Sequence, residues 1–311
     1  MKDKKEIGIL PASILLSGAI LAAAFLLKSD KAQTNVSVSD SSRVASSNTS
    51  GAANASVSTS ESVLPAVWGN LGKKLVDLGV IDKNKFEVLY TSRGGLTKEQ
   101  KDLLYGESNG KIVLNEQNAG YYLNLLWALG LANKSSILEK GEMTNPSYGG
   151  AGNFASTGGW TLAEGSAMDH YSAHEIIKLT PEQETLVDKV SRNIYRPCCG
   201  NSTHFPDCNH GMAMLGLLEI MASQGATEDE MYKTALEANT YWFPGAYGII
   251  NDYIQKSGKS GTLSAKDVLG SAYSSSAGLQ NISQLVEKLN VNGSSSGAGN
   301  AGGNKSPGCS V

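Results

Sequence analysis

The sequence predicts a mainly α-helical protein, and three stretches carry that prediction. Residues 180–183 (TPEQ) combine a threonine cap, a proline at the first helical position and a glutamine that completes a capping box. Residues 227–230 (TEDE) form a second capping box. Residues 118–132 are the most apolar stretch after the N-terminus, too short and too glycine-interrupted for a membrane span. We expect a central core helix there.

Residues 7–27 are 21 uncharged residues near the start of the 311-residue chain. As a helix they would span about 31 Å, close to the hydrocarbon thickness of a bilayer. A cleaved signal peptide is the alternative, with Ala22-Ala23-Ala24 as the small-residue site, but the apolar run continues through Leu27. We predict an uncleaved transmembrane anchor, with residues 1–6 as a cytoplasmic tail and the bulk of the chain extracytoplasmic, at the cell membrane.

Residues 28–63 are rich in serine and contain no aromatic residue, and residues 292–311 are rich in glycine, serine and asparagine. Neither segment can bury enough apolar surface to offset chain entropy, so we predict a disordered tether and a disordered tail. The net charge of -3 and the absence of a long basic run exclude nucleic acid as a partner. The expected partners are the membrane, through the N-terminal helix, and another extracytoplasmic protein.

The body between these segments divides into four parts. Residues 64–144 form an N-terminal helical part, and residues 145–179 a glycine-rich connecting segment that covers the cysteines with Phe154 and Trp160 as packing anchors. Residues 180–243 form a three-helix subdomain, and residues 244–291 the C-terminal helices. Outside 118–132, helices are expected at 64–78 (Val67, Leu71, Leu75 and Leu78 on one stripe), 82–90, 97–104, 180–196 (ended by Pro197), 211–224, 227–239, 245–256 and 278–289.

The stretch 196–211 contains three of the four cysteines, and it is the predicted loop of a helical hairpin. Thiolates and imidazoles are the ligands that zinc prefers, and they also suit copper. Five side chains within thirteen residues supply them, although no Cys-x2-Cys pair of a standard zinc finger is present. The candidate metal ligands are Cys198, Cys199, His204, Cys208 and His210.

Thiol chemistry is a second interpretation of the same loop. Cys208 and His210 lie at the start of a predicted helix, where backbone N–H groups stabilise a thiolate. Cys198, Cys199 and Cys208 would then be the catalytic thiols, passing a disulfide by exchange. The third interpretation is a structural disulfide from Cys208 to one of the adjacent pair. Cys309 is about 100 residues away on the tail.

An enzyme site in the glycine-rich segment is a further alternative, with Asp169, His170 and His174 as its polar groups. The two histidines are four residues apart, so one helical face could present both, either as metal ligands or as ordinary hydrogen-bonded side chains. Signatures of covalent haem attachment, serine hydrolases, zincins and kinases are absent from the sequence.

Several residues carry a resemblance to known proteins: Pro197-Cys198-Cys199-Gly200, Cys208-Asn209-His210, 214–219 (MLGLLE) and 225–232 (GATEDEMY). Residues 180–239 resemble the three-helix domain of the cytochrome c biogenesis thiol-oxidoreductase subunit. They also look like the PCYCGC class of extracytoplasmic cysteine-motif proteins. That resemblance implies a helix–cysteine loop–helix–helix architecture outside a membrane. The biogenesis family uses a Cys-x-x-Cys pair, whereas this chain has adjacent cysteines and a third nine residues on.

These observations predict a membrane-anchored extracytoplasmic protein with a metal-binding or thiol-disulfide redox site. The alternative is a non-catalytic envelope or surface protein whose loop is held by a structural disulfide. Whether the chain is an enzyme stays open at this point, and zinc and copper are the candidate cofactors.

Overall fold

A computed structural model describes residues 61–293 of the chain, and the side chains through residue 291. The predicted anchor at 7–27, the tether up to residue 60, the tail after residue 293 and Cys309 lie outside the described residues. Of the helices between residues 61 and 293, none combines the length and the apolar character needed to cross a membrane.

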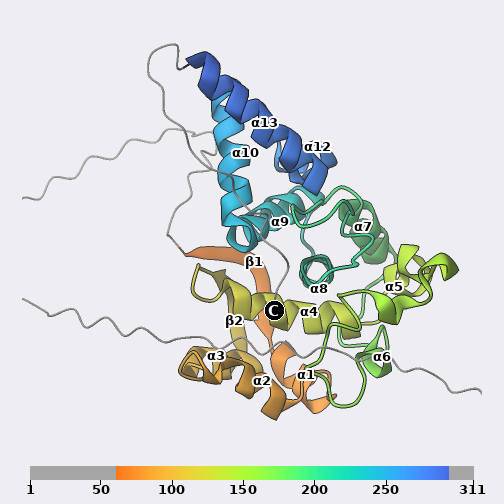
Figure 1. Ribbon diagram of the computed structural model, residues 1–311. Helices are drawn as coiled ribbons and strands as arrows, with labels where there is room; N and C mark the ends of the chain where they lie inside the picture. The colour runs from red at the N-terminus through yellow and green to blue at the C-terminus, as the bar shows by residue number, and fades with distance from the viewer. Residues whose placement is uncertain (1–60, 294–311) are drawn as a thin grey trace, which may run out of the picture. The chain divides into compact units, whose positions relative to one another are not determined.

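The described part is mainly helical, as predicted (Figure 1). Its elements are β1 (Ser62–Gly69), α1 (Leu71–Asp77), α2 (Lys83–Thr91), α3 (Lys98–Tyr105), β2 (Asn109–Leu114), α4 (Ala119–Ala132), α5 (Ser136–Lys140), η1 (Glu142–Thr144), η2 (Pro146–Tyr148), η3 (Ala151–Asn153), α6 (Ala167–His170), α7 (Pro181–Ser191), α8 (Asn209–Ser223), α9 (Glu228–Trp242), α10 (Pro244–Lys256), α11 (Ala265–Leu269), α12 (Ser271–Ser274) and α13 (Ser276–Gly293).

The predicted helix over 64–78 is wrong in its first half, because residues from Ser62 onward form strand β1. Leu64, Ala66 and Trp68 are fully buried while Val63 and Val67 are exposed, which is the two-residue period of a strand. The strand therefore also takes the last residues that we assigned to the disordered tether. Only α1, from Leu71 onward, keeps the helical stripe.

Strand β1 pairs antiparallel with β2, a strand that the sequence did not predict. The ladder is irregular between Val63 and Val67, where Pro65 has no N–H to donate. On β1, the backbone of Val67 donates to and accepts from the side-chain amide of Gln224, at 2.8 Å in both bonds. Strand β1, in a region predicted to be entirely helical, is thus hydrogen-bonded to the C-terminal end of α8.

Helices α4 and α8 form the centre of the core and lie side by side in Figure 1. Nearly every residue of both is buried, so neither has a polar face. Their backbones approach closely at Gly130 and Gly216, where a Cβ added to Gly216 would lie 2.6 Å from the carbonyl oxygen of Leu126. The predicted core helix at 118–132 is confirmed, with α8 as its partner.

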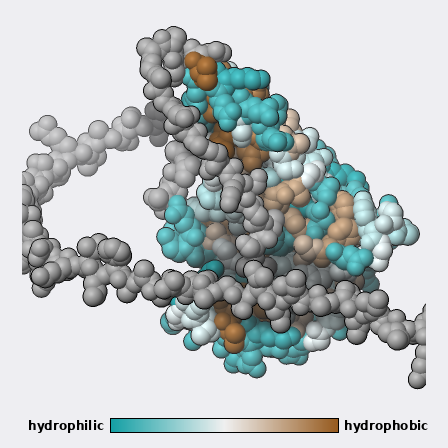
Figure 2. All heavy atoms as spheres, viewed as in Figure 1, coloured by the Kyte–Doolittle hydropathy of each residue, from teal (hydrophilic) through white to brown (hydrophobic). Residues whose placement is uncertain are grey.

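The remaining helices surround this pair. Capping boxes begin α7 and α9, as the sequence predicted, and a further one begins α3. Helix α7 ends at Ser191, well before Pro197, and α8 begins at Asn209, so His210 lies within its first turn. Helices α10 and α13 pack together with a separate small apolar cluster that includes Tyr247, Ile250 and Ile282. The visible surface of α13 is largely hydrophilic (Figure 2).

Candidate functional site

The loop between α7 and α8 is held in place by backbone hydrogen bonds. Tyr195 and Ser202 form an isolated antiparallel bridge, and Thr203 N–H donates to the carbonyl of Ile194 at 2.8 Å. Tyr195 N–H donates to the carbonyl of Leu269 on α11 at 2.9 Å. The loop is therefore a small closed turn, and residues 197–201, with two of the cysteines, lie at its tip.

Three thiols converge where this tip meets the start of α8. Cys208 is the N-cap residue of α8 and is 8% exposed. Its Sγ lies 3.6 Å from the Sγ of Cys198. Cys199 lies beside them, with its Sγ 3.9 Å from Oδ1 of Asp207. All three are free thiols, because a disulfide would place two sulfurs about 2.05 Å apart.

A buried arginine organises the loop around Cys208. The Arg196 side chain is almost fully buried, and its Nε donates to Cys208 Sγ at 3.0 Å. The other guanidinium nitrogens donate to the carbonyls of Asn201 and Phe205, at 3.2 and 3.1 Å, and to Asp207 Oδ1 at 2.5 Å. These bonds pair the buried guanidinium with a sulfur and with oxygens of the loop. Burial of a charge requires such partners.

The first turn of α8 leaves room for that guanidinium. Gly211 lies directly against it, and a Cβ at this position would stand 2.5 Å from Arg196 Cζ. Since no real Cβ contact is that short, the position needs a residue without a side chain. The glycine lets a buried positive charge reach the N-cap thiol.

The three thiols differ in acidity. Hydrogen bonds from Cys198 and Cys199, and the charge of Arg196, lower the pKa of Cys208 well below its usual value despite burial. Hydrogen bonding with Cys199 and Cys208, together with burial, raises the pKa of Cys198. The pKa of Cys199 rises to about 11, because its bond to Cys208 and its burial outweigh its bond to Cys198. Cys208 is therefore the most acidic thiol of the cluster.

His210 completes a ligand set with two of the thiols. One ligand atom from each of Cys198, Cys208 and His210 lies within 4.8 Å of the other two, and Cys199, Asp207 and Cys208 form a second such group. Among the described residues, the buried Nδ1 of His210 has no hydrogen-bond partner. The imidazole ring packs on Phe243, with centroids 4.3 Å apart.

Comparison with protein-family models, curated proteins and solved structures finds no match for this chain. The resemblance to cysteine-motif proteins stays a prediction. Function therefore has to be argued from the geometry of the loop itself.

His204 does not join the cluster, so its prediction as a ligand is corrected. Its Nδ1 is 2.5 Å from a carboxylate oxygen of Glu142, and its Nε2 is 2.9 Å from one of Asp188. The bonds of the loop back to α7, including His204 N–H to the carbonyl of Ser191 at 3.2 Å, turn the ring away from the thiols. His204 instead joins α7 to η1.

The polar groups of the glycine-rich segment have structural roles. His170 Nδ1 is 3.0 Å from His174 Nε2, and His170 Nε2 is 2.9 Å from the carbonyl of Glu164. Asp169 completes the capping box of α6. Helix α6 ends at His170, so no helical face presents both histidines. The bonds support the hydrogen-bonded interpretation of the pair over the ligand or enzyme interpretations.

The glycine-rich segment covers the loop, as predicted. Ser156 N–H donates to the carbonyl of Asp207 at 3.1 Å, and the rings of Phe154 and Phe205 meet edge to face at 5.3 Å. Trp160 anchors the segment elsewhere, against Trp127 of α4.

The roles of Arg196, Gly211 and Phe243 were not predicted from the sequence. One signal was available: an arginine within a cysteine loop, followed by a glycine in the first turn of the next helix. Phe243 follows α9 and carried no signal, because only the tertiary fold brings it to His210.

Proposed function

We propose that this protein binds one thiophilic metal ion, zinc or copper(I), through Cys198, Cys208 and His210. The convergence of these three groups, with His210 Nδ1 buried and unpartnered, is the observation that carries the proposal. A buried imidazole nitrogen without a hydrogen-bond partner costs free energy. Coordination of a metal ion by that nitrogen would remove this cost.

The sulfur spacing supports the same conclusion. Two sulfur ligands of a tetrahedral zinc ion, each bonded at about 2.3 Å, lie about 3.8 Å apart. Cys198 and Cys208 are separated by 3.6 Å. Cys199 is the nearest further soft donor and contacts the same thiol group, so it is the candidate for a fourth ligand.

Arg196 and Asp207 act as supporting groups in this proposal. Arg196 donates to the Cys208 sulfur and thereby orients it, in the way that outer partners usually fix metal ligands. The ion pair with Asp207 keeps the guanidinium charge balanced inside the protein.

Thiol-disulfide exchange is the second candidate, and a different observation favours it. The contact of Arg196 Nε with Cys208 at 3.0 Å and the position of Cys208 at the start of α8 both stabilise a free thiolate. Cys198, at 3.6 Å, is the thiol that would form the disulfide with it.

Metal content and free thiols of the full chain, purified without added reductant and with oxygen excluded, test both candidates. The metal proposal expects about one zinc or copper(I) ion per chain, with no disulfide in the loop. Cys208→Ser and His210→Gln should weaken binding about tenfold or more, since even outer partners contribute that much. His174→Gln, which changes a described histidine outside the cluster, should leave affinity unchanged.

The other outcomes separate the remaining alternatives. A chain without metal whose Cys198–Cys208 disulfide is reduced at the potentials of exchange proteins overturns the metal proposal and supports exchange. A chain without metal whose disulfide resists reduction overturns both the metal and the exchange proposals. The Cys198–Cys208 disulfide would then have a structural role only.

A further inference from the structure

A second polar site lies on α8, away from the thiols. Glu219 is a carboxylic acid with no exposed surface, set in an otherwise apolar helix. Asn133 Nδ2 donates to its Oε2 at 2.9 Å. Its Oε1 is buried and has no hydrogen-bond partner among the described residues. A buried acid with an unsatisfied oxygen is costly to the fold unless something binds it.

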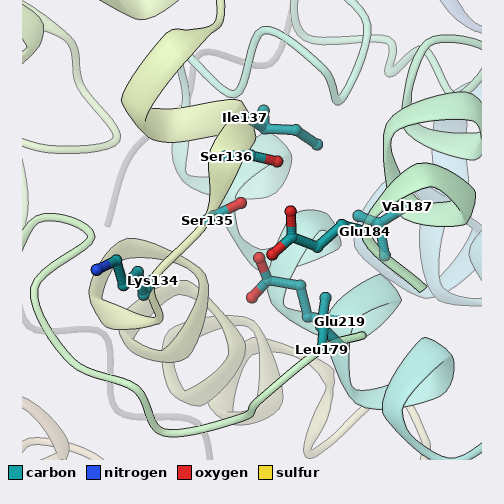
Figure 3. A pocket seen from close by; sticks show the side chains of 8 residues that line it. All are labelled: Lys134, Ser135, Ser136, Ile137, Leu179, Glu184, Val187 and Glu219. Atoms are coloured by element: carbon teal, nitrogen blue, oxygen red, sulfur yellow. The ribbon is translucent and has the colours of Figure 1, made fainter. Parts of the chain in front are cut away.

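That carboxyl group faces a small pocket between three elements. Glu184 of α7, Ser135 before α5 and Glu219 line it, and their oxygens point toward one another (Figure 3). The pocket holds about 10 Å³, roughly the room that one water or one small ion needs. Ser135 is the N-cap residue of α5, yet its hydroxyl caps no N–H of that helix. The hydroxyl instead interacts with the Glu219 carboxyl group, where it opposes the effect of burial on the pKa of that acid.

The pocket contains no counter-charge in the described part of the chain. Lys134 also lines it, but its amino group points away from the two carboxyl groups in Figure 3. Neither glutamate forms a salt bridge with a described residue, and the nearby charge of Glu184 adds to the cost of ionising Glu219. Burial raises the pKa of Glu219 to about 8. Without a bound cation, the Glu219 carboxyl group therefore keeps its proton at neutral pH.

We propose that Glu219, Glu184 and Ser135 form a binding site for one hard divalent cation, Mg²⁺ or Ca²⁺. The donors are all oxygens, which these ions prefer, and two carboxylates with water from the solvent side are a usual ligand set for Mg²⁺. The Glu219 carboxyl group lines this ion-sized space opposite the Glu184 carboxyl group (Figure 3), and its Oε1 has no hydrogen-bond partner among the described residues. Soft ions are better served by the thiols.

A cation here would join the segment before α5 to α7 and α8. Glu184 lies in the first turn of α7, and Glu219 in the second half of α8, so the ion would bridge the two helices that flank the cysteine loop. Binding would stabilise the folded state by mass action.

Thermal unfolding and calorimetric titration of the full chain with magnesium or calcium chloride, at about pH 8, test the site. Sodium chloride at equal ionic strength corrects for general screening. We expect saturable binding of one ion with a rise in Tm, and protons released in proportion as Glu219 loses its proton. The cation that raises Tm more at equal concentration is the one that the site prefers.

Glu184→Gln removes one carboxylate from an exposed position and should fold normally. It should weaken the cation about tenfold or more. Glu219→Gln, the neutral isostere of the protonated acid, should abolish the response. Glu182→Gln is the matched control, because it removes the same charge from an exposed position of the same helix. Its response should equal that of the wild type.

An unresponsive wild-type chain overturns the proposal. A response that Glu184→Gln retains in full also overturns it, because the ion would then act elsewhere on the surface. Mg²⁺ and Ca²⁺ compete poorly for thiolates, so either result leaves the cysteine site untouched.

Discussion

Replacing Gly211 with alanine tests whether the buried arginine organises the cysteine loop. The new Cβ would stand 2.5 Å from Arg196 Cζ and 2.6 Å from its Nη2. The guanidinium is held by its bonds to Asn201, Phe205 and Asp207, so it can move only by giving up at least one of them. Either α8 shifts or at least one of those bonds breaks.

The magnitude follows from three opposing effects. Overpacking costs about 1–3 kcal/mol, and a lost bond to a charged group costs about 1.5–3 kcal/mol. Alanine regains about 1 kcal/mol over glycine as a helix former. The net expectation is a destabilisation of about 1.5–5 kcal/mol. Loss of the Arg196 contact would raise the pKa of Cys208, so its thiol should react more slowly with a disulfide reagent at neutral pH.

Gly248→Ala is the matched control. Gly248 lies inside α10, and a Cβ there meets no atom within 4 Å. This variant should gain about 0.5–1 kcal/mol. Urea unfolding gives both free energies, and thiol titration gives the reactivity. If Gly211→Ala matches Gly248→Ala in stability and leaves the reactivity of Cys208 at its wild-type value, the role assigned to Arg196 is wrong.

Two further predictions concern α8. Gly216→Ala should lower the free energy of unfolding by about 3 kcal/mol, at the upper end for overpacking, because the new Cβ meets the backbones of Leu126 and Gly130 on α4. Urea unfolding measures this change. A change as small as that of Gly248→Ala would contradict the close crossing of the two helices. Glu219 has a pKa of about 8 in the fold against its usual 4.5, so its contribution to stability is complete below the lower value and is lost as pH rises toward the higher. Without divalent cations, the free energy of unfolding of Glu219→Gln should fall less steeply from pH 5 to 8 than that of the wild type, by up to about 1.4 kcal/mol per pH unit; equal slopes would show that Glu219 is already ionised.

The helices were predictable where local chemistry alone determines them. Thr97, Thr180 and Thr227 all begin helices with capping boxes, which depend on residues within one turn. Strand β1 was missed because its apolar residues also fit a helical stripe, and only pairing with β2 decides between the two periods. Pro65 was the local signal against a helix.

The candidate site was predictable to the extent that it is local. Cys198, Cys199, Cys208 and His210 are brought together by one short loop and the helix that follows it. His204 lies in the same loop, but bonds to distant residues turn it toward Glu142 and Asp188. Spacing in sequence cannot report which way a ring turns when its partners come from other elements. The pocket at Glu219 was missed for the same reason, because Ser135 and Glu184 reach it from different parts of the chain.

Helix α8 links the two proposed sites to the core. It carries Cys208 at its N-cap, Gly216 at its crossing with α4, and Glu219 beyond that crossing. Cys198 lies on the loop, which is held closed by the Tyr195–Ser202 bridge and by the bond from Arg196 to the carbonyl of Asn201. The 3.6 Å spacing of the two sulfurs thus depends on how a rigid helix sits against a closed loop. A substitution at Gly216 should therefore weaken metal binding without touching a ligand, and metal should in turn restore part of the stability that the substitution removes.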